Sequence, residues 1–489
     1  MSSELVPSSR TRFWGVCLLA PVFFGLGGCF SKRREPDLGL LYNQPAQLLG
    51  DNRTPVVVLP GILGSKLEAL DTGQLVWGAF TYGAADADYP EGARTVALPM
   101  QQGVGLADLN DNVHATGVLD RLAVDLALVA RVRIGAYVDI LRTLGAGNYR
   151  DKDLAGDSKV EYEGLHYTCF QYPYDWRRDC SEQAVSLHEQ IQAASRLAAE
   201  GRGLPVGTPV KLDVIAHSMG GLVLRYYLRY GPNPLPDDGS LPPLTWEGAE
   251  HIRHAVFVGT PSAGSTDSLV RLTEGLSPGF FAPDYRAGIL GTMPAIYQLL
   301  PRKRHKLIVD RETREPLDLL DVEVWKRYGW GLADPSEMKV LRWLLPDAAS
   351  DEERRAIAVD HLEKCLARAG QFQRALDVPA TPPPGLEMVL FLGDASPTPS
   401  LVGVNRKGRL KTLETAPGDK IVTRSSALMD ERVGSEWRPH LDSPIAWDRV
   451  QFLPEDHLGL TKSSAFSDNL LFMLLEAPED LEDSPGATL

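Results

Sequence analysis

The stretch "LDVIAHSMGGLVLRYYL", residues 212 to 228, joins an apolar run directly to a helical pattern. The run from Val210 to Ala216 is expected to be a buried strand, with β-branched residues at Val210, Val214 and Ile215. Ser218 follows with small residues around it, and Gly220 and Gly221 come next. A serine at the joint of a buried strand and an amphipathic helix is typical of a nucleophile elbow, in which a tight turn presents the hydroxyl.

The rest of the chain alternates between strand-like and helical segments. Apolar residues recur at helical spacing from Ser181, a candidate N-cap, to Gly201, and the C-terminal "SSAFSDNLLFMLLE" is also helical. The strand-like segments are 54–65, 165–176, 210–216, 251–265, 386–393, 418–428 and 447–457. Such alternation predicts an α/β fold whose mainly parallel sheet carries helices on both faces.

Breaks in this alternation predict the domain organisation. The α/β core is expected over 53–264 and 386–476, interrupted by an insertion at 265–385 that has helical pieces and long polar loops. Residues 29–52 are expected to be a tether. Residues 477–489 form an acidic tail that is expected to be disordered.

The N-terminal segment has the features of an export signal. Two arginines precede an apolar run that is too short and too glycine-rich for a comfortable membrane span. The run ends in Leu26-Gly27-Gly28-Cys29, which resembles a bacterial lipobox. We therefore expect residues 1–28 to be a signal peptide and Cys29 to be lipidated, so that acyl chains anchor an exported lipoprotein in the cell envelope. The alternative is an uncleaved N-terminal helix with a chance cysteine.

Charge and cysteine content narrow the possible partners. The net charge is −14 and no Lys/Arg block stands out in the mature chain, which argues against a nucleic-acid partner. In an oxidising compartment Cys169 and Cys180 could close a short disulfide loop, or they could be two unrelated buried thiols. Cys365 lies four residues after His361, but without a further ligand nearby we expect a surface coincidence and no metal site.

A serine nucleophile needs a base, which in this fold follows the acid in the chain. Only His440 and His457 lie late enough to follow an acid placed after the insertion. His457 comes between the strand-like "VQFLP" and the C-terminal helix, which is where a base is expected. His440, in "WRPHLDSP", lacks that setting and is expected to be a loop residue.

Two aspartates compete as the residue that orients the base. Asp419 lies in a turn before a β-branched run, and Asp394 follows the strand-like "LEMVLFLG". Asp456 adjoins His457, and neighbouring residues seldom point their side chains at each other. These positions alone leave both Asp419 and Asp394 open.

Backbone N–H groups are the expected oxyanion donors. Met219 follows the serine at the start of a helix, where free donors and the helix dipole favour a developing negative charge. The second donor should come from the loop after an early strand. In "LPGILGS" this donor is Ile62, with Leu63 as the alternative.

The chain resembles the lecithin:cholesterol acyltransferase-like branch of the α/β hydrolases. The stretches that carry the resemblance are "PVVVLPGILGSKLE", "YPYDWR", "AHSMGGLVLRYYL", "VGTPSAGS", "MPAIYQLLP", "GDASPTP" and "GDKIVTRSSAL", together with the His457 loop. The resemblance implies an α/β-hydrolase fold, a cap at 265–385, and Asp419 rather than Asp394 as the acid. The chain departs from the family at Lys420 and Ile421, where small or polar residues are more usual.

The expected function is acyl transfer from a lipid ester through Ser218, His457 and Asp419, without a cofactor. The expected partners are a lipid ester, an acyl acceptor and a membrane. The alternatives are a lipase, phospholipase or carboxylesterase that uses water as the acceptor, and a catalytically inactive lipid-binding protein of the same fold. In the insertion, Phe280 and Phe281 between prolines are expected either to enter a bilayer surface or to be buried in the cap.

Overall fold

The computed structural model describes residues 35–49, 53–80, 83–119, 123–124, 136–156, 167–277 and 282–477. Asp37–Leu489 form one compact unit. The predicted signal peptide, Cys29, Phe280, Phe281 and the tail from residue 478 lie outside the described residues. No helix within the described ranges has the length and hydropathy needed to span a bilayer.

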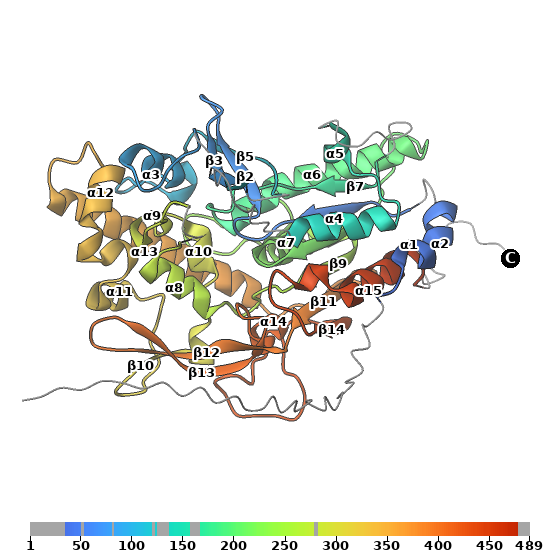
Figure 1. The fold of residues 1–489 in the computed structure, drawn as a ribbon. Helices are drawn as coiled ribbons and strands as arrows, with labels where there is room; N and C mark the ends of the chain where they lie inside the picture. Colours follow the sequence, from blue (N-terminus) through green and yellow to red (C-terminus); the bar gives the residue numbers. More distant parts are fainter. Residues whose placement is uncertain are drawn as a thin grey trace, which may run out of the picture. The chain divides into compact units, whose positions relative to one another are not determined.

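A six-stranded parallel sheet forms the centre of the molecule (Figure 1). Its order is β14-β11-β9-β8-β1-β7. The strands are β1 (Val56–Leu59), β7 (Cys169–Gln171), β8 (Leu212–His217), β9 (Ile252–Val258), β11 (Glu387–Gly393) and β14 (Arg449–Leu453). The predicted α/β class with a mainly parallel sheet is confirmed.

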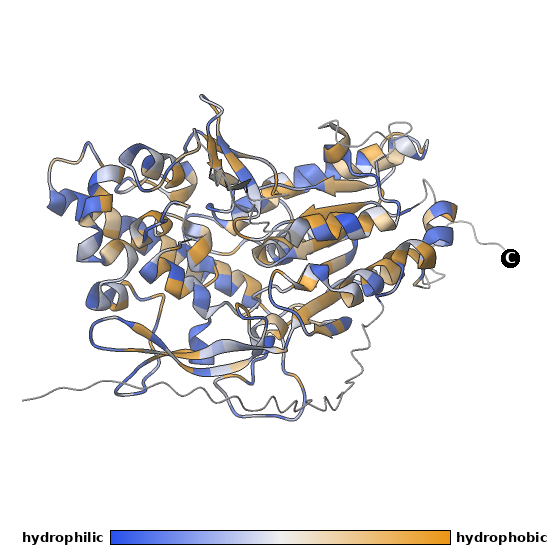
Figure 2. Cartoon of the chain, viewed as in Figure 1, coloured by the Kyte–Doolittle hydropathy of each residue, from blue (hydrophilic) through white to orange (hydrophobic). Residues whose placement is uncertain are grey.

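Helices cover both faces of this sheet. Alternate strand residues point to opposite faces, so that Val57 and Leu59 belong to one apolar cluster while Val56 and Val58 belong to the other. The first face is covered by α6 (Cys180–Gly201) and α7 (Met219–Tyr230), the second by α4 (Ala136–Ala146) and α15 (Ser464–Leu475). Figure 2 shows the strands mainly in orange, as expected for strands buried on both sides.

The insertion between β9 and β11 is largely helical (Figure 1). Its elements are α8 (Thr266–Glu274), α9 (Ala287–Leu290), α10 (Pro294–Gln298), β10 (Ile308–Asp310), α11 (Val322–Tyr328), α12 (Met338–Leu344) and α13 (Asp351–Asp377). β10 pairs in parallel with β12 (Ser396–Val404), which forms a hairpin with β13 (Leu410–Gly418). The insertion therefore shares a three-stranded sheet with residues beyond its predicted end.

The segment after β1 forms a smaller antiparallel sheet of β2 (Ser65–Ala69), β3 (Leu75–Trp77) and β5 (Val113–Val118). Helix α3 (Pro90–Val96) from this segment contacts α12 of the insertion. The remaining short elements are β4 (Ala79–Phe80), β6 (Ala123–Val124) and α5 (Lys152–Gly156). Turns of 3₁₀ helix lie at Leu106–Asp108, Glu247–His251, Lys303–His305, Gly331–Ala333, Pro335–Glu337 and Leu460–Lys462.

Part of the predicted tether is folded onto the core. Helices α1 (Leu38–Leu41) and α2 (Asn43–Leu48) flank Tyr42, which is buried. The Tyr42 hydroxyl donates to the carboxylate of Asp468 on α15 at 2.6 Å. The expectation of a tether is therefore wrong for residues 38–48, which are helical and fixed to α15 through Tyr42.

The β-branched run at 418–428 is not a strand of the central sheet. The chain leaves β13 at Gly418, turns, and enters α14 (Arg424–Leu428), whose N-cap is Thr423. The turn uses backbone N–H groups that a strand would offer to a neighbour, because Ile421 and Val422 both donate to the Asp419 side chain. Local hydrogen bonds between the backbone and the Asp419 side chain here override strand propensity.

The possible disulfide between Cys169 and Cys180 is not formed, and both are free, buried thiols. Cys169 belongs to the apolar cluster on one face of the sheet and Cys180 to the cluster on the other face. The Cys169 thiol donates to Asp151 at 3.3 Å. The helix that begins at Cys180 is capped by Asp179, not by Ser181.

His361 and Cys365 are both buried in α13, so they are not surface residues as expected. His361 Nε2 lies 3.0 Å from the carbonyl oxygen of Thr292, which occupies one ring nitrogen. Within the described ranges, no group of three or more His, Cys, Asp or Glu is placed to hold a metal ion.

Candidate active site

Ser218 occupies the turn between β8 and α7. Its φ is 52° and its ψ is −124°, a left-handed conformation that costs a non-glycine residue about 1–3 kcal/mol. The Ser218 N–H donates to the carbonyl oxygen of Val258 on β9 at 2.8 Å, which holds the turn against the sheet. The helix begins at Met219, directly after the serine.

The glycines after Ser218 allow α7 to pack closely against two strand ends. A Cβ on Gly220 would lie 2.3 Å from the carbonyl oxygen of Pro60, which follows β1. A Cβ on Gly221 would lie 2.0 Å from Oγ1 of Thr260, which follows β9. Glycine is therefore required at both positions for the helix to approach the sheet.

The structure brings Ser218, His457 and Asp419 together in one hydrogen-bonded line. His457 Nε2 lies 2.9 Å from Ser218 Oγ, and His457 Nδ1 lies 2.7 Å from Asp419 Oδ2. The three residues are 8%, 9% and 1% exposed, respectively. Such an arrangement can activate a serine hydroxyl, because the imidazole can accept its proton while the carboxylate holds the ring in position.

The Asp419 carboxylate is held by the backbone of its own turn. Its Oδ1 accepts from the N–H of Ile421 at 3.0 Å and of Val422 at 2.6 Å, which leaves Oδ2 for His457. The N–H of His457 in turn donates to the Asp419 carbonyl oxygen at 2.9 Å. Lys420, where the chain departs from the family pattern, has a φ of 80°, so it is the residue of this turn with a left-handed backbone.

The competing residues lie elsewhere. Asp394 pairs with Arg424 at 3.4 Å, and Asp456 pairs with Lys420 at 3.2 Å. His440 is an exposed loop residue. Within the described part of the chain, none of these three residues has a side chain that hydrogen-bonds to Ser218 or His457.

The loop after β1 lies directly against the serine. A Cβ on Gly61 would lie 2.7 Å from the Ser218 Cβ, so the backbone at Gly61 contacts the serine side chain. Among the described residues, no protein acceptor receives the N–H of Ile62 or Met219. Leu63 has a φ of 64°, which re-aims the backbone just after Ile62.

Aromatic side chains from separate segments hold this loop. Two tyrosines bond to its first residues: Tyr137 Oη accepts from Gly61 N at 2.6 Å, and Tyr174 Oη donates to Pro60 O at 2.9 Å. Two tryptophans bond further along: Trp77 Nε1 donates to Leu63 O at 2.8 Å, and Trp176 Nε1 donates to Ser65 O at 3.3 Å. Tyr174 and Trp176 belong to the "YPYDWR" stretch, for which sequence reasoning offered no role. Tyr137 carries no sequence signal.

The insertion is attached to the helix that follows the serine. Arg225 on α7 donates to the carbonyl oxygen of Leu376 at 2.8 Å, and Tyr230 donates to that of Ala375 at 2.8 Å. Arg229 donates to the carbonyl oxygen of Val378. Cations and donors at the C-terminal end of α13 satisfy its last carbonyl groups. Burial lowers the pKa of Arg225 to about 9.

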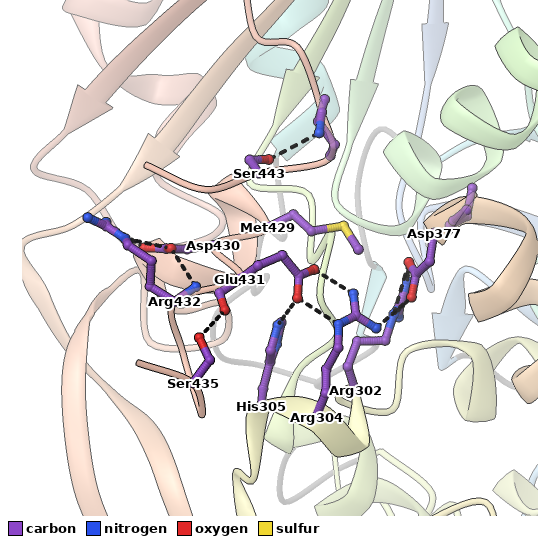
Figure 3. Close-up of polar contacts among 12 residues, drawn as sticks. Arg302, Arg304, His305, Asp377, Met429, Asp430, Glu431, Arg432, Ser435 and Ser443 are labelled. Carbon is purple, nitrogen blue, oxygen red and sulfur yellow. Dashed lines mark hydrogen bonds and ion pairs between the residues drawn. The ribbon is translucent and has the colours of Figure 1, made fainter. Parts of the chain in front are cut away.

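A second attachment joins the insertion to the segment beyond α14 (Figure 3). Asp377, at the end of α13, pairs with Arg302 and Arg304. Glu431 accepts from Arg304 Nε at 2.6 Å and lies 3.2 Å from His305 Nε2. This ion-pair network joins the insertion to the chain between Asp419 and β14, the strand that precedes His457.

The strand order, the elbow and the order of serine, aspartate and histidine along the chain define the α/β-hydrolase fold. Residues 162–321 match the family model described as lecithin:cholesterol acyltransferase, which confirms the resemblance over that segment. The match supports an enzyme that acts on lipid esters, as an acyltransferase or as an esterase-type hydrolase.

One solved structure supports the fold. A chain of the Tle4–Tli4 complex is 14% identical with a TM-score of 0.55, and the match covers 86% of this chain and 98% of that one. Bacillus licheniformis lipase BlEst2 is 10% identical with a TM-score of 0.29, covering 86% and 92% of the two chains. Only the first similarity is close enough to bear on the fold. The chain matches no curated protein.

Proposed function

We propose that the protein is a serine-dependent O-acyltransferase that acts on phospholipid-type esters through an acyl-enzyme. The observation that carries this proposal is the hydrogen-bonded line of Ser218, His457 and Asp419 beneath a loop with free N–H groups. The family match supplies lipid esters as the substrate class. Neither half of the reaction requires a cofactor.

In the first half-reaction Ser218 Oγ attacks the ester carbonyl carbon while its proton passes to His457 Nε2. The resulting oxyanion is stabilised by the N–H groups of Ile62 and Met219. As the ester C–O bond breaks, His457 returns the proton to the leaving alcohol, and the acyl group stays on Ser218. Asp419 keeps Nδ1 protonated and stabilises the imidazolium.

In the second half-reaction an acceptor hydroxyl gives its proton to His457 and attacks the acyl-enzyme. The new ester leaves as Ser218 regains its proton. The family match supports an alcohol acceptor over water. Vesicles that contain labelled phospholipid and a long-chain alcohol or sterol should yield more ester than free fatty acid. Free acid as the nearly exclusive product with several acceptors would instead establish a lipase or phospholipase.

The role of the serine is tested separately from the choice of acceptor. Ser218→Ala should abolish labelling by a fluorophosphonate probe and lower turnover by several orders of magnitude. His457→Ala should be comparably severe, whereas His440→Ala should have little effect. A wild-type protein that neither reacts with the probe nor turns over any ester would favour the inactive lipid-binding alternative.

We further propose that Cys29 is lipidated and anchors the exported enzyme to the cell envelope. The lipobox-like Leu26-Gly27-Gly28-Cys29 supports this proposal. A membrane anchor would keep the enzyme at the surface where its lipid esters reside. For the same reason Phe280 and Phe281 remain candidates for bilayer contact, and replacing both with serine should reduce activity on vesicles while sparing a short soluble ester.

A further inference from the structure

Two buried side chains link the loop at Gly61 to the loop that carries His457. Tyr137 Oη accepts from Gly61 N at 2.6 Å and lies 3.3 Å from His217 Nδ1. His217 Nε2 lies 3.1 Å from the carbonyl oxygen of His457. Tyr137 is on α4 and His217 ends β8, next to Ser218. The link therefore joins four distant segments of the chain around the reacting groups.

The donors and acceptors in this link have one consistent assignment. Gly61 N–H can only donate, so Tyr137 Oη accepts there and its own proton is directed to His217 Nδ1. The His457 carbonyl oxygen can only accept, so His217 Nε2 carries the proton. His217 is therefore a neutral ring with one defined tautomer. Burial is the main reason that the pKa of His217 is lowered to about 3, and the charge of nearby His457 acts in the same direction.

Packing restricts both rings to this arrangement. The Tyr137 and His217 rings meet edge to face, with centroids 5.6 Å apart. The His217 and His457 rings lie 5.0 Å apart. A Cβ on Gly64 would lie 2.7 Å from the Tyr137 hydroxyl, so the phenol is wedged under the loop that contains Ile62. Side chains fixed by packing can hold their partners within the narrow tolerance that catalysis requires.

We propose that Tyr137 and His217 are positioning residues that set the distance between the oxyanion donor at Ile62 and the base His457. Among the described residues, neither side chain forms a hydrogen bond to Ser218 Oγ or to the His457 ring. Tyr137 fixes the peptide that precedes the Ile62 donor, and His217 fixes the backbone of the base. This inference rests on the proposed function, because it assigns these partners to the same reaction.

The decisive variant is Tyr137→Phe, which keeps the ring and removes the hydroxyl that joins the two halves. With a soluble p-nitrophenyl ester, kcat should fall about 10- to 100-fold, with KM changed less than about twofold. A trifluoromethyl ketone, which forms a tetrahedral adduct on the serine, should bind more weakly by the same factor as kcat/KM falls. A general loss of folded protein would lower the apparent kcat without weakening ketone binding to the molecules that stay folded.

The matched control is Tyr149→Phe. Tyr149 is buried in the same apolar cluster, and its hydroxyl has no hydrogen-bond partner among the described residues. Its removal should leave kcat and ketone binding unchanged. A conservative series at His217 gives a second measurement: His217→Gln keeps an N–H that can reach the His457 carbonyl oxygen and should retain about tenfold more activity than His217→Leu.

Two results would overturn the positioning role while leaving the proposed function intact. One is a kcat for Tyr137→Phe equal to that of Tyr149→Phe in a wild-type enzyme that reacts with the ester. The other is weakened ketone binding without a matching fall in kcat/KM. If the wild-type protein itself fails to react with a fluorophosphonate, the proposed function fails, and this inference fails with it.

Discussion

Gly221 and Thr260 are in such close contact that a Cβ on the glycine would lie 2.0 Å from the threonine Oγ1. Gly221 lies in the first turn of α7 and Thr260 follows β9, so this contact sets how closely the helix after the serine approaches the sheet. Thr260 cannot move away easily, because it is fully buried. The geometry of the elbow therefore depends on the absence of a single methyl group.

Gly221→Ala should destabilise the protein by about 1–3 kcal/mol through overpacking, despite the better helix propensity of alanine. The measurement is urea-induced unfolding followed by circular dichroism. Gly145→Ala in α4 is the matched control, because a Cβ there would meet no atom within 4 Å. It should gain about 0.5–1 kcal/mol. Equal effects at the two sites would show that α7 can shift to accept a Cβ.

Asp419→Asn should lower kcat by a factor on the order of 10⁴, because an amide at this position favours the wrong tautomer of His457. Asp394→Asn should change kcat little, since Asp394 pairs with Arg424 on the surface. Both variants should remain folded by circular dichroism. A larger fall in kcat for Asp394→Asn would mean that Asp394, in the loop after β11, orients the base.

Stability should fall as the pH drops below about 6.5, in part because His361 is buried as a neutral ring. Burial lowers the pKa of His361 to about 4, and the hydrogen bond from its ring to Thr292 only partly offsets this effect. Between about pH 6.5 and 4 the unfolded chain binds a proton that the folded chain does not, so unfolding is favoured. His361→Gln should flatten the dependence of unfolding free energy on pH in this range. An unchanged slope would contradict the buried neutral histidine.

Glu431→Gln should loosen the attachment of the insertion and cost about 1 kcal/mol at neutral pH. Burial would raise the pKa of Glu431, but hydrogen bonds and charges from Arg304 and His305 outweigh it and lower the pKa to about 2. The stabilisation by this carboxylate is therefore complete above about pH 4.5 and is lost as the pH falls toward 2. Thermal unfolding at several pH values should show the difference between variant and wild type disappearing in that range.

The control for that network is Glu312→Gln, which breaks the exposed pair with Arg406. Because both partners are largely solvated, the expected cost is under about 0.5 kcal/mol. If the two variants cost the same, the Glu431 network contributes no more than an ordinary surface pair.

Cys29→Ser should abolish metabolic labelling with palmitate and leave the signal segment uncleaved at that site. Cys17→Ser should still be labelled, because Cys17 would depart with the signal peptide. Unchanged labelling of Cys29→Ser would contradict the lipobox interpretation.

Local chemistry explains why the placement of His457 beside Ser218 was predictable from the sequence. The elbow is a contiguous strand, turn and helix, and the base was restricted by chain order to two histidines. Asp419 required the family resemblance, because its turn imitates a strand: the β-branched residues after it donate their N–H groups to the carboxylate. A periodicity argument has no means of detecting such a use of the backbone.

The supporting residues were beyond prediction because their roles arise only from tertiary contacts. Tyr137 bonds to a loop 76 residues away in sequence, Trp77 bonds to the same loop from a different strand, and neither lies in a recognisable pattern. The sharing of a sheet between β10 and the β12–β13 hairpin is equally non-local. Cys169 and Cys180 appeared close along the chain, yet the sheet separates them.

The position of His457 after β14 affects when the candidate site can form during synthesis and folding. β14 is an edge strand of the central sheet and the last one to leave the ribosome. A nascent chain therefore carries the serine elbow long before it carries the histidine, and the histidine reaches the serine only after β14 has paired with β11. Under the proposed function, a chain that ends before β14 would lack this histidine and could not react with lipid esters.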